Sequence, residues 1–247
     1  MSKPKLRIGL IGTGFMGKAH VFGFASAPRV FELPYDLDLR TVADITPEAA
    51  ASAARTLGFT NATANWRDII NDPEIDVVDI TAPNALHKEM ALAAIAAGKH
   101  VYCEKPLAPL SGDALEMTEA AEAKGIKTQV GFNYLCNPML TFAREMIQAG
   151  ELGEIRGYRG SHCEDYMADA NGGYTFRHDS AGGGARADRW ARAISPSWRA
   201  ITGMTPSPGF RDPSVRATLV DVRSPEPPCR VPPRTQLVDQ AGIAPRL

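Results

Sequence analysis

The first pattern with chemical meaning is a G-x-G-x-x-G turn, made of Gly12, Thr13, Gly14, Phe15, Met16 and Gly17. An apolar run precedes it and a helix-like segment follows it, and in that setting such turns hold a dinucleotide pyrophosphate. Gly12 allows the tight turn, Gly14 lets the backbone approach the pyrophosphate, and Gly17 lets the helix pack close to the strand. The start of the helix adds free N–H groups and a partial positive charge. The alternative is an ordinary strand-to-helix turn.

Asp44 is the second candidate, because it stands at the end of the next strand-like segment. An acidic residue in this place accepts hydrogen bonds from the adenosine ribose hydroxyls. Its charge would repel a 2′-phosphate, so it favours NAD as the cofactor, with NADP possible. Its separation from the glycines exceeds the usual ~20 residues, and residues 31–38 are interpreted as an insertion that explains the excess. The alternative is an aspartate that caps the helix beginning at Thr46-Pro47.

Two polar motifs follow two further strand-like segments. Ala82-Pro83-Asn84-Ala85-Leu86-His87 comes after one of them, and Glu104-Lys105-Pro106 comes after the next. Ligands of open α/β sheets bind beyond the carboxyl ends of the strands, where both motifs fall. A lysine there can hydrogen-bond a substrate hydroxyl and assist its proton transfer. The alternatives are a solvated surface lysine for Lys105 and a structural histidine for His87.

These motifs lie on alternating strand-like and helix-like segments. Strands are expected at 6–11, 39–43, 76–81, 100–103 and 127–131. The first helix should end at about Ala27, because Pro28 follows; further helices are expected at 46–57, 66–70, 85–97 and 111–124. This order predicts an α/β fold with a Rossmann doubly wound parallel sheet, forming a dinucleotide-binding domain over residues 1–132.

The chain changes character after residue 132. A helix at 138–149 and a strand at 154–163 predict the start of a second, α+β substrate domain over residues 133–184, which remains incomplete. Residues 185–247 hold 10 of the 19 prolines and 10 of the 19 arginines, and no lysine. Such a composition interrupts helices and sheet ladders, so we expect an irregular Arg/Pro-rich tail.

Composition narrows the class of partner. The formal net charge of −1 gives no electrostatic basis for binding nucleic acid or an anionic membrane, and no apolar run approaches the ~18 residues of a membrane span. The four cysteines lack zinc-site spacing, so no metal is expected, and their scatter fits a reducing cytoplasm. The expected partner is therefore a small molecule, with neither nucleic acid nor a membrane involved.

In order along the chain, these motifs resemble the Gfo/Idh/MocA oxidoreductases, which are NAD(P)-dependent dehydrogenases of sugars, inositols and related polyols. The resemblance covers about residues 5–185, and its most specific element is Glu104-Lys105-Pro106 at a strand end. It also includes Lys18-Ala19-His20 after the turn, Thr81 before the first polar motif, and Gly131-Phe132-Asn133-Tyr134 with Asn137-Pro138. The sequence around Phe31, 66–70 and 160–166 is most similar to that of dehydrogenases of anhydrosugars, such as levoglucosan, and of inositols.

The resemblance implies roles for individual residues. Lys105 would contact the hydroxyl that is oxidised and join the proton relay. Glu104 and Pro106 would shape the nicotinamide pocket, with a cis peptide before Pro106. The cofactor would be lined further by Thr81, Pro83, Asn84, His87 and Asn133, and the substrate by Tyr134 and Glu164.

The catalytic set departs from the family pattern. Members place an Asp, and four residues later a His, after a glycine-rich stretch, which here is 182–185. Asp188 takes the Asp place and would be the second catalytic and substrate-contacting residue, but Arg192 stands where the His is expected. A guanidinium stays protonated and cannot act as a general base. His162 and His178 lie nearby without the required spacing.

The family's second domain is longer than the portion of this chain beyond residue 132, and it carries one wall of the substrate site and usually the subunit interface. The homo-oligomer typical of the family is therefore doubtful for this chain. The tail resembles an out-of-frame translation of GC-rich coding sequence; the alternative is a genuine divergent tail. Two functions remain open: a sugar or polyol dehydrogenase, and a dinucleotide-binding protein or sensor without turnover.

Overall fold

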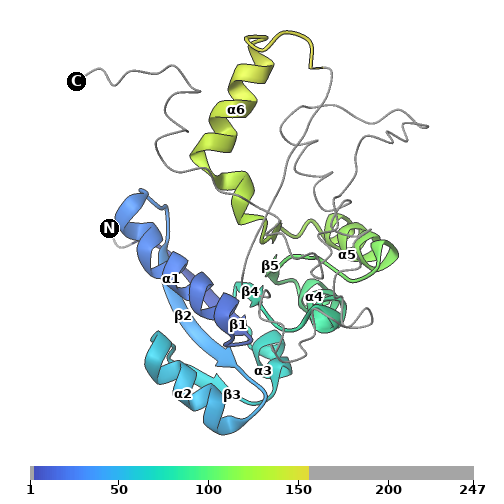
Figure 1. The fold of residues 1–247 in the computed structure, drawn as a ribbon. Coiled ribbons are helices and arrows are strands. Elements are labelled where there is room, and N and C mark those ends of the chain that lie inside the picture. The colour runs from blue at the N-terminus through green and yellow to red at the C-terminus, as the bar shows by residue number, and fades with distance from the viewer. Residues whose placement is uncertain (1–2, 156–247) are drawn as a thin grey trace, which may run out of the picture. The chain divides into compact units, whose positions relative to one another are not determined.

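The computed structural model of the chain describes residues 3–155. Of these, 3–142 form one compact unit and 143–155 belong to a second. The first unit is built on a six-stranded parallel sheet in the order β3-β2-β1-β4-β5-β6 (Figure 1). The strands are β1 Lys5–Ile11, β2 Asp36–Ala43, β3 Asn61–Thr63, β4 Val77–Ile80, β5 His100–Cys103 and β6 Thr128–Val130. This strand order confirms the predicted doubly wound Rossmann sheet.

Helices cover both faces of the sheet (Figure 1). The α-helices are α1 Phe15–Val30, α2 Pro47–Leu57, α3 Trp66–Asn71, α4 His87–Ala96, α5 Ser111–Lys124 and α6 Pro138–Gln148, with 3-10 turns η1 Asn84–Leu86 and η2 Asn133–Cys136. Leu10 and Val42 pack with Val21 of α1 and Ala53 of α2 on one face. The other face packs against α3, α4 and α5, through side chains such as Val78, Ile80, Ile69, Met90 and Met117.

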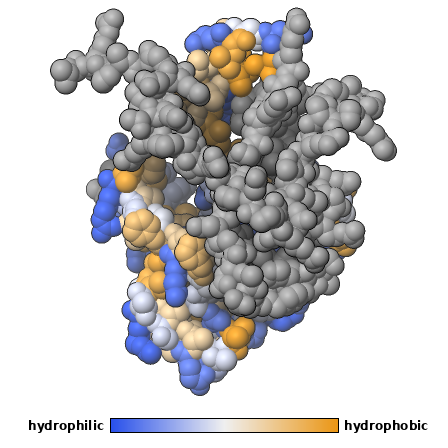
Figure 2. Space-filling view, in the orientation of Figure 1, coloured by the Kyte–Doolittle hydropathy of each residue, from blue (hydrophilic) through white to orange (hydrophobic). Residues whose placement is uncertain are grey.

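Alternation along β4 sends one charged side chain to the α1 face. Val78 and Ile80 are buried in the core on the α4 side, whereas Asp79 between them is also fully buried and faces the opposite way. Apolar side chains also remain at the surface of α1, where Phe22 is 75% exposed. Apolar residues are visible over this part of the molecule among hydrophilic ones (Figure 2).

Helix-capping residues in the sequence begin and end helices where they are expected to. Thr46 caps α2, since its hydroxyl accepts a hydrogen bond from the N–H of Ala49 at 3.1 Å. Gly58 ends that helix with a φ of +84°, and Gly125 ends α5 with a φ of +66°, both in the left-handed region that favours glycine.

Two expectations about element boundaries are wrong, and one strand of the structure has no counterpart among the expected elements. Pro28 does not stop α1, which continues to Val30: it lies in the last turn, which the N–H of Phe31 closes on the carbonyl of Ala27 at 2.8 Å. The start of β2 at Asp36 lies inside the supposed insertion, because its first residues pair with Lys5 and its neighbours on β1. β3 was not expected at all.

Of the expected strand at 154–163, residues 154 and 155 are described and are not in a strand, and 156–163 lie outside the described residues, as does the tail at 185–247. The domain boundary at 132 stays a prediction. Among residues 3–155, no helix is long and apolar enough to cross a membrane.

Candidate functional site at the carboxyl edge of the sheet

Gly12 and Gly17 shape the turn between β1 and α1 by lacking side chains. Gly12 has a φ of +98°, and its N–H donates to the carbonyl of Ala43 at 2.9 Å. A Cβ on Gly17 would overlap the carbonyl oxygen of Gly12. The hydroxyl of Thr81 donates to that same oxygen at 2.7 Å. The turn is therefore held against the end of β4, as the glycine pattern predicts.

Gly14 has a different environment, because a Cβ there would meet no atom of residues 3–155 within 4 Å. It is the N-cap of α1, with no side-chain capping bond and no acidic residue in the first turn. Packing within the described residues therefore does not require Gly14 to lack a side chain. The open space before the free N–H groups of α1 fits a pyrophosphate.

Asp44 is tied to the glycine turn. Its Oδ2 accepts hydrogen bonds from the N–H of Thr13 at 3.1 Å and from the Thr13 hydroxyl, and its Oδ1 accepts one from the N–H of Ile45 at 2.7 Å. The helix-capping alternative is wrong, because Thr46 caps α2. A hollow of about 200 Å³ lies beside this pair, lined by Thr13, Lys18, Ala49, Ser52, Ala53, Thr56 and Leu57.

His87 connects the two loops that follow β4 and β5. Its side chain is fully buried, with Nδ1 2.9 Å from the carbonyl of Pro106 and Nε2 2.8 Å from the carbonyl of Ala82. These contacts favour the structural alternative for its side chain. Pro83 and Asn84 lie in the loop and 3-10 turn that His87 holds in place.

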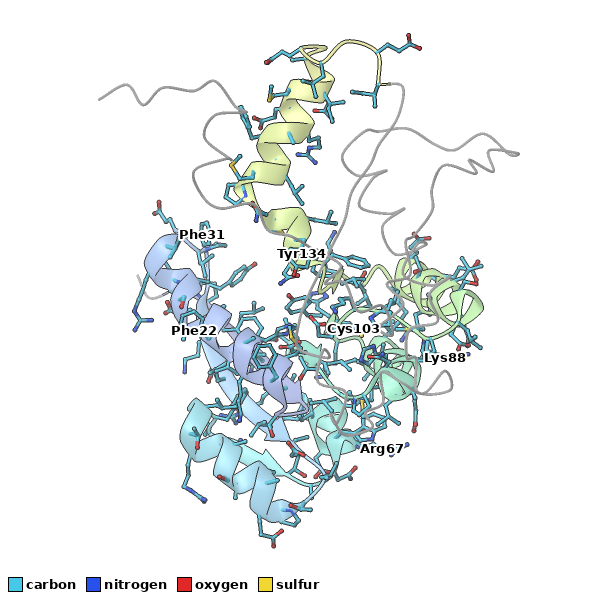
Figure 3. The ribbon with its side chains drawn as sticks, viewed as in Figure 1. Phe22, Phe31, Arg67, Lys88, Cys103 and Tyr134 are labelled. Atoms are coloured by element: carbon cyan, nitrogen blue, oxygen red, sulfur yellow. The ribbon has the colours of Figure 1, made fainter. Side chains whose placement is uncertain are left out.

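The Glu104-Lys105-Pro106 motif follows β5 directly, and Cys103 marks the end of that strand in Figure 3. Glu104 is buried, and its Oε2 accepts a hydrogen bond from the N–H of Lys105 at 3.1 Å. The Lys105–Pro106 peptide is cis, as the family resemblance implies. The side chain of Lys105 is exposed, so its amine is available to a ligand at this edge.

Asn133 and Tyr134 belong to η2, which follows β6. Both are exposed, and Tyr134 is labelled in Figure 3. Their expected contacts with nicotinamide and substrate stay predictions. Glu164, Asp188 and Arg192 lie outside the described residues, so the expected catalytic set is seen only in part.

A buried cluster links α1 to the ends of β4 and β5. The Nδ1 of His20 lies 3.0 Å from both carboxylate oxygens of Asp79, and its Nε2 lies 3.2 Å from Oε1 of Glu104. The ring of Tyr102 stacks on the imidazole, with centroids 4.7 Å apart. Sequence reasoning missed this cluster: His20 was part of a motif without a role. The signal that could have flagged it is a lone aspartate in an apolar strand.

The cluster perturbs the ionisation of its members. Burial alone would lower the pKa of His20, but the hydrogen bonds and negative charges of Asp79 and Glu104 outweigh it and raise that pKa to about 9. Burial raises the pKa of Asp79, with hydrogen bonding to His20 opposing it. On the other face of β5, burial raises the pKa of the Cys103 thiol to about 12, with a smaller contribution from the two carboxylates. Within residues 3–155, no group of three or more His, Cys, Asp or Glu side chains is arranged to hold a metal ion.

Comparison with known families decides the assignment of the fold. Residues 6–132 match the family Gfo/Idh/MocA, described as "Oxidoreductase family, NAD-binding Rossmann fold". The chain belongs to this family. The match confirms the predicted fold, the class of oxidoreductases and NAD as the cofactor of the family.

Individual relatives are dehydrogenases of sugars and polyols. A levoglucosan dehydrogenase of Pseudarthrobacter phenanthrenivorans is 46% identical over 186 residues, which are 74% of this chain and 48% of the relative. An inositol 2-dehydrogenase/D-chiro-inositol 3-dehydrogenase of Lactiplantibacillus plantarum is 32% identical over 167 residues, covering 65% and 46% of the two chains. A solved levoglucosan dehydrogenase in complex with NADH and levoglucosan superposes with a TM-score of 0.76 at 41% identity, over 81% of this chain and 54% of that one. This Gfo/Idh/MocA chain therefore spans about half the length of the relatives it matches.

Proposed function

We propose that this chain is an NAD-dependent oxidoreductase that oxidises a secondary hydroxyl of a cyclic sugar or polyol, of the anhydrosugar or inositol type. The observation that carries the proposal is the exposed Lys105 directly after β5. β5 pairs with β4, whose end is bonded to the glycine turn through Thr81. A cofactor on that turn and a substrate at Lys105 would share one edge of the sheet. The relatives named for levoglucosan and inositol support the substrate class.

The residues that would hold NAD follow the ends of five strands, β1, β2, β4, β5 and β6. Asp44 would accept hydrogen bonds from the adenosine ribose hydroxyls, and its charge disfavours the 2′-phosphate of NADP. The pyrophosphate would lie on the first turn of α1. The full set is Gly12, Thr13, Gly14, Phe15, Met16 and Gly17 for the pyrophosphate, and Thr81, Pro83, Asn84, Glu104 and Asn133 toward the nicotinamide.

The protein's own contribution is to place the hydroxyl and to move its proton. Bound NAD⁺ supplies the acceptor for the hydride that leaves the carbinol carbon. The amine of Lys105 would hydrogen-bond the hydroxyl and, with Asp188, pass its proton to solvent as the C–O bond becomes a carbonyl. Tyr134 and Glu164 would contact the remaining hydroxyls.

Turnover tests this proposal. The chain is incubated with NAD⁺ and levoglucosan, glucose or an inositol, and NADH is followed by its absorbance. We expect Lys105→Met to lower kcat about 10²-fold or more, because it removes the group that handles the proton, while NADH binding is unchanged. Lys124→Met is the matched control, since Lys124 is the last residue of α5 and its amine donates to the carbonyl of Ala96, at the opposite edge of the sheet from Lys105.

A second function has its own support. Arg192 stands where the family resemblance places a histidine, and a guanidinium cannot act as a general base. A wild-type chain that binds NADH normally but turns over no substrate would select a dinucleotide-binding protein or sensor.

A further inference from the structure

The His20–Asp79–Glu104 cluster is the part of the described structure that the proposed mechanism leaves unexplained. Three titratable side chains from α1, β4 and the loop after β5 meet there with little access to solvent, since His20 is 9% exposed, Asp79 0% and Glu104 5%. Burying charged groups costs free energy unless they are paired and hydrogen-bonded. Asp79 and Glu104 each obtain a hydrogen bond from the same imidazole. One cation thus holds two carboxylates together.

The carboxylate of Glu104 has a separate partner on each oxygen. Oε1 faces Nε2 of His20 at 3.2 Å, and Oε2 accepts the N–H of Lys105 at 3.1 Å. Gly131, at the end of β6, leaves room for this side chain, because a Cβ there would overlap Oε1. His20 of α1, the Lys105 N–H after β5 and Gly131 after β6 therefore determine the orientation of the Glu104 side chain.

We propose that His20 is a positioning residue for Lys105, acting through Glu104. The imidazole, fixed on Asp79 and stacked on Tyr102, holds the Glu104 carboxylate so that its free oxygen receives the Lys105 N–H. The direction in which the lysine leaves β5 then depends on a residue of α1. The catalytic part of this inference rests on the proposed function, whereas the hydrogen-bond relay does not.

Two substitutions separate the two contacts of His20. The amide nitrogen of Asn lies near the position of Nδ1, and that of Gln lies near Nε2. His20→Asn should keep the bond to Asp79 and lose the bond to Glu104, while His20→Gln should do the reverse. A purely structural histidine would make both variants respond alike, in proportion to their loss of stability.

The direct readout is hydrogen exchange of the Lys105 amide in the full chain, measured by NMR and corrected for global stability. We expect exchange within about threefold of wild type in His20→Gln, and about 10-fold or more faster in His20→Asn, because only the latter releases Glu104. His20→Asn should also lower kcat more than His20→Gln does, while KM for NAD⁺ changes less in both variants. Equal exchange rates in the two variants would overturn the proposal.

A measurement on the wild type covers the case in which both variants fail to fold. The amide shift of Lys105 should titrate with the same midpoint as the ring nitrogens of His20, which is faced by Asp79, Tyr102 and Glu104. Independent midpoints would overturn the relay. A wild type that shows this coupling but no turnover with any sugar would contradict the proposed function and leave the relay standing.

Discussion

Gly14 and Gly17 lie in one turn, yet the two glycines lack a side chain for different reasons. A methyl group on Gly17 would overlap the carbonyl of Gly12, whereas one on Gly14 would meet no described residue within 4 Å. Packing against the Gly12 carbonyl therefore requires Gly17 to lack a side chain. Gly14 leaves space in which the proposed cofactor pyrophosphate would approach the turn.

Alanine substitutions should separate these two requirements. Gly17→Ala should lower the free energy of unfolding by about 1–3 kcal/mol, because the overlap forces the helix away from the strand. Gly14→Ala should cost no more than about 1 kcal/mol but weaken NADH binding about 10-fold or more, because the methyl occupies the space assigned to the pyrophosphate. Urea unfolding and fluorescence titration with NADH provide the two measurements.

Gly23→Ala is the matched control for that pair. Gly23 lies within α1, and a Cβ there meets nothing within 4 Å, so alanine should raise helix stability by up to about 1 kcal/mol and leave NADH binding unchanged. If Gly14→Ala bound NADH as tightly as Gly23→Ala does, the open space at the turn would not be the cofactor site.

The elements α1, β4 and β5 are linked through His20, and this link should make stability depend on pH. The pKa of His20 rises from 6.5 to about 9 on folding, so its stabilising effect is complete below about pH 6.5 and is lost as the pH passes 9. The shift corresponds to about 3 kcal/mol. Urea unfolding between pH 6.5 and 9 should show the fall.

His20→Gln should remove most of this slope, because an amide does not titrate. The other groups that face His20 are Asp79, Tyr102 and Glu104. Burial raises the pKa of Tyr102 above its usual 10, so that group acts above the window, and burial also raises the pKa of Asp79. A slope unchanged in His20→Gln would assign the pH dependence to another group.

The sequence predicts the bounds of an element closely where a capping residue marks its end. It does not predict elements that exist because they pair with a distant strand. The expected bounds of α5 agree with the structure because Gly125 ends the helix. β3 has three residues and no pattern of its own; its pairing with β2 defines it. Likewise, His20 and Asp79 are 59 residues apart, and their contact depends on which face of β4 carries the aspartate. The glycine turn and Lys105 were predicted because each follows its own strand.

At the scale of the molecule, the described residues contribute unequally to the two halves of a dinucleotide. The turn, Asp44 and the start of α1 are all described and would hold the adenosine and pyrophosphate. Thr81, Pro83, Asn84, Glu104 and Asn133 would lie toward the nicotinamide, and the expected substrate contacts Glu164 and Asp188 lie outside residues 3–155. The start of α1 favours the charged pyrophosphate, so most of the binding free energy contributed by the described residues should come from the ADP-ribose portion of the cofactor.

This division predicts which fragments of the cofactor stabilise the chain. At about 100 times its Kd, a ligand of the folded state adds about 2.7 kcal/mol to the free energy of unfolding. ADP-ribose and NADH at equal concentration should raise Tm by similar amounts, and nicotinamide mononucleotide should raise it little. Gly14→Ala should reduce both shifts by about half or more, because the two ligands share the pyrophosphate and a 10-fold weaker Kd leaves about 1.4 kcal/mol at the same concentration. A shift with NADH but none with ADP-ribose would instead place the main contacts at the ends of β4 and β5, and would make Lys105 and its neighbours the principal cofactor-binding residues.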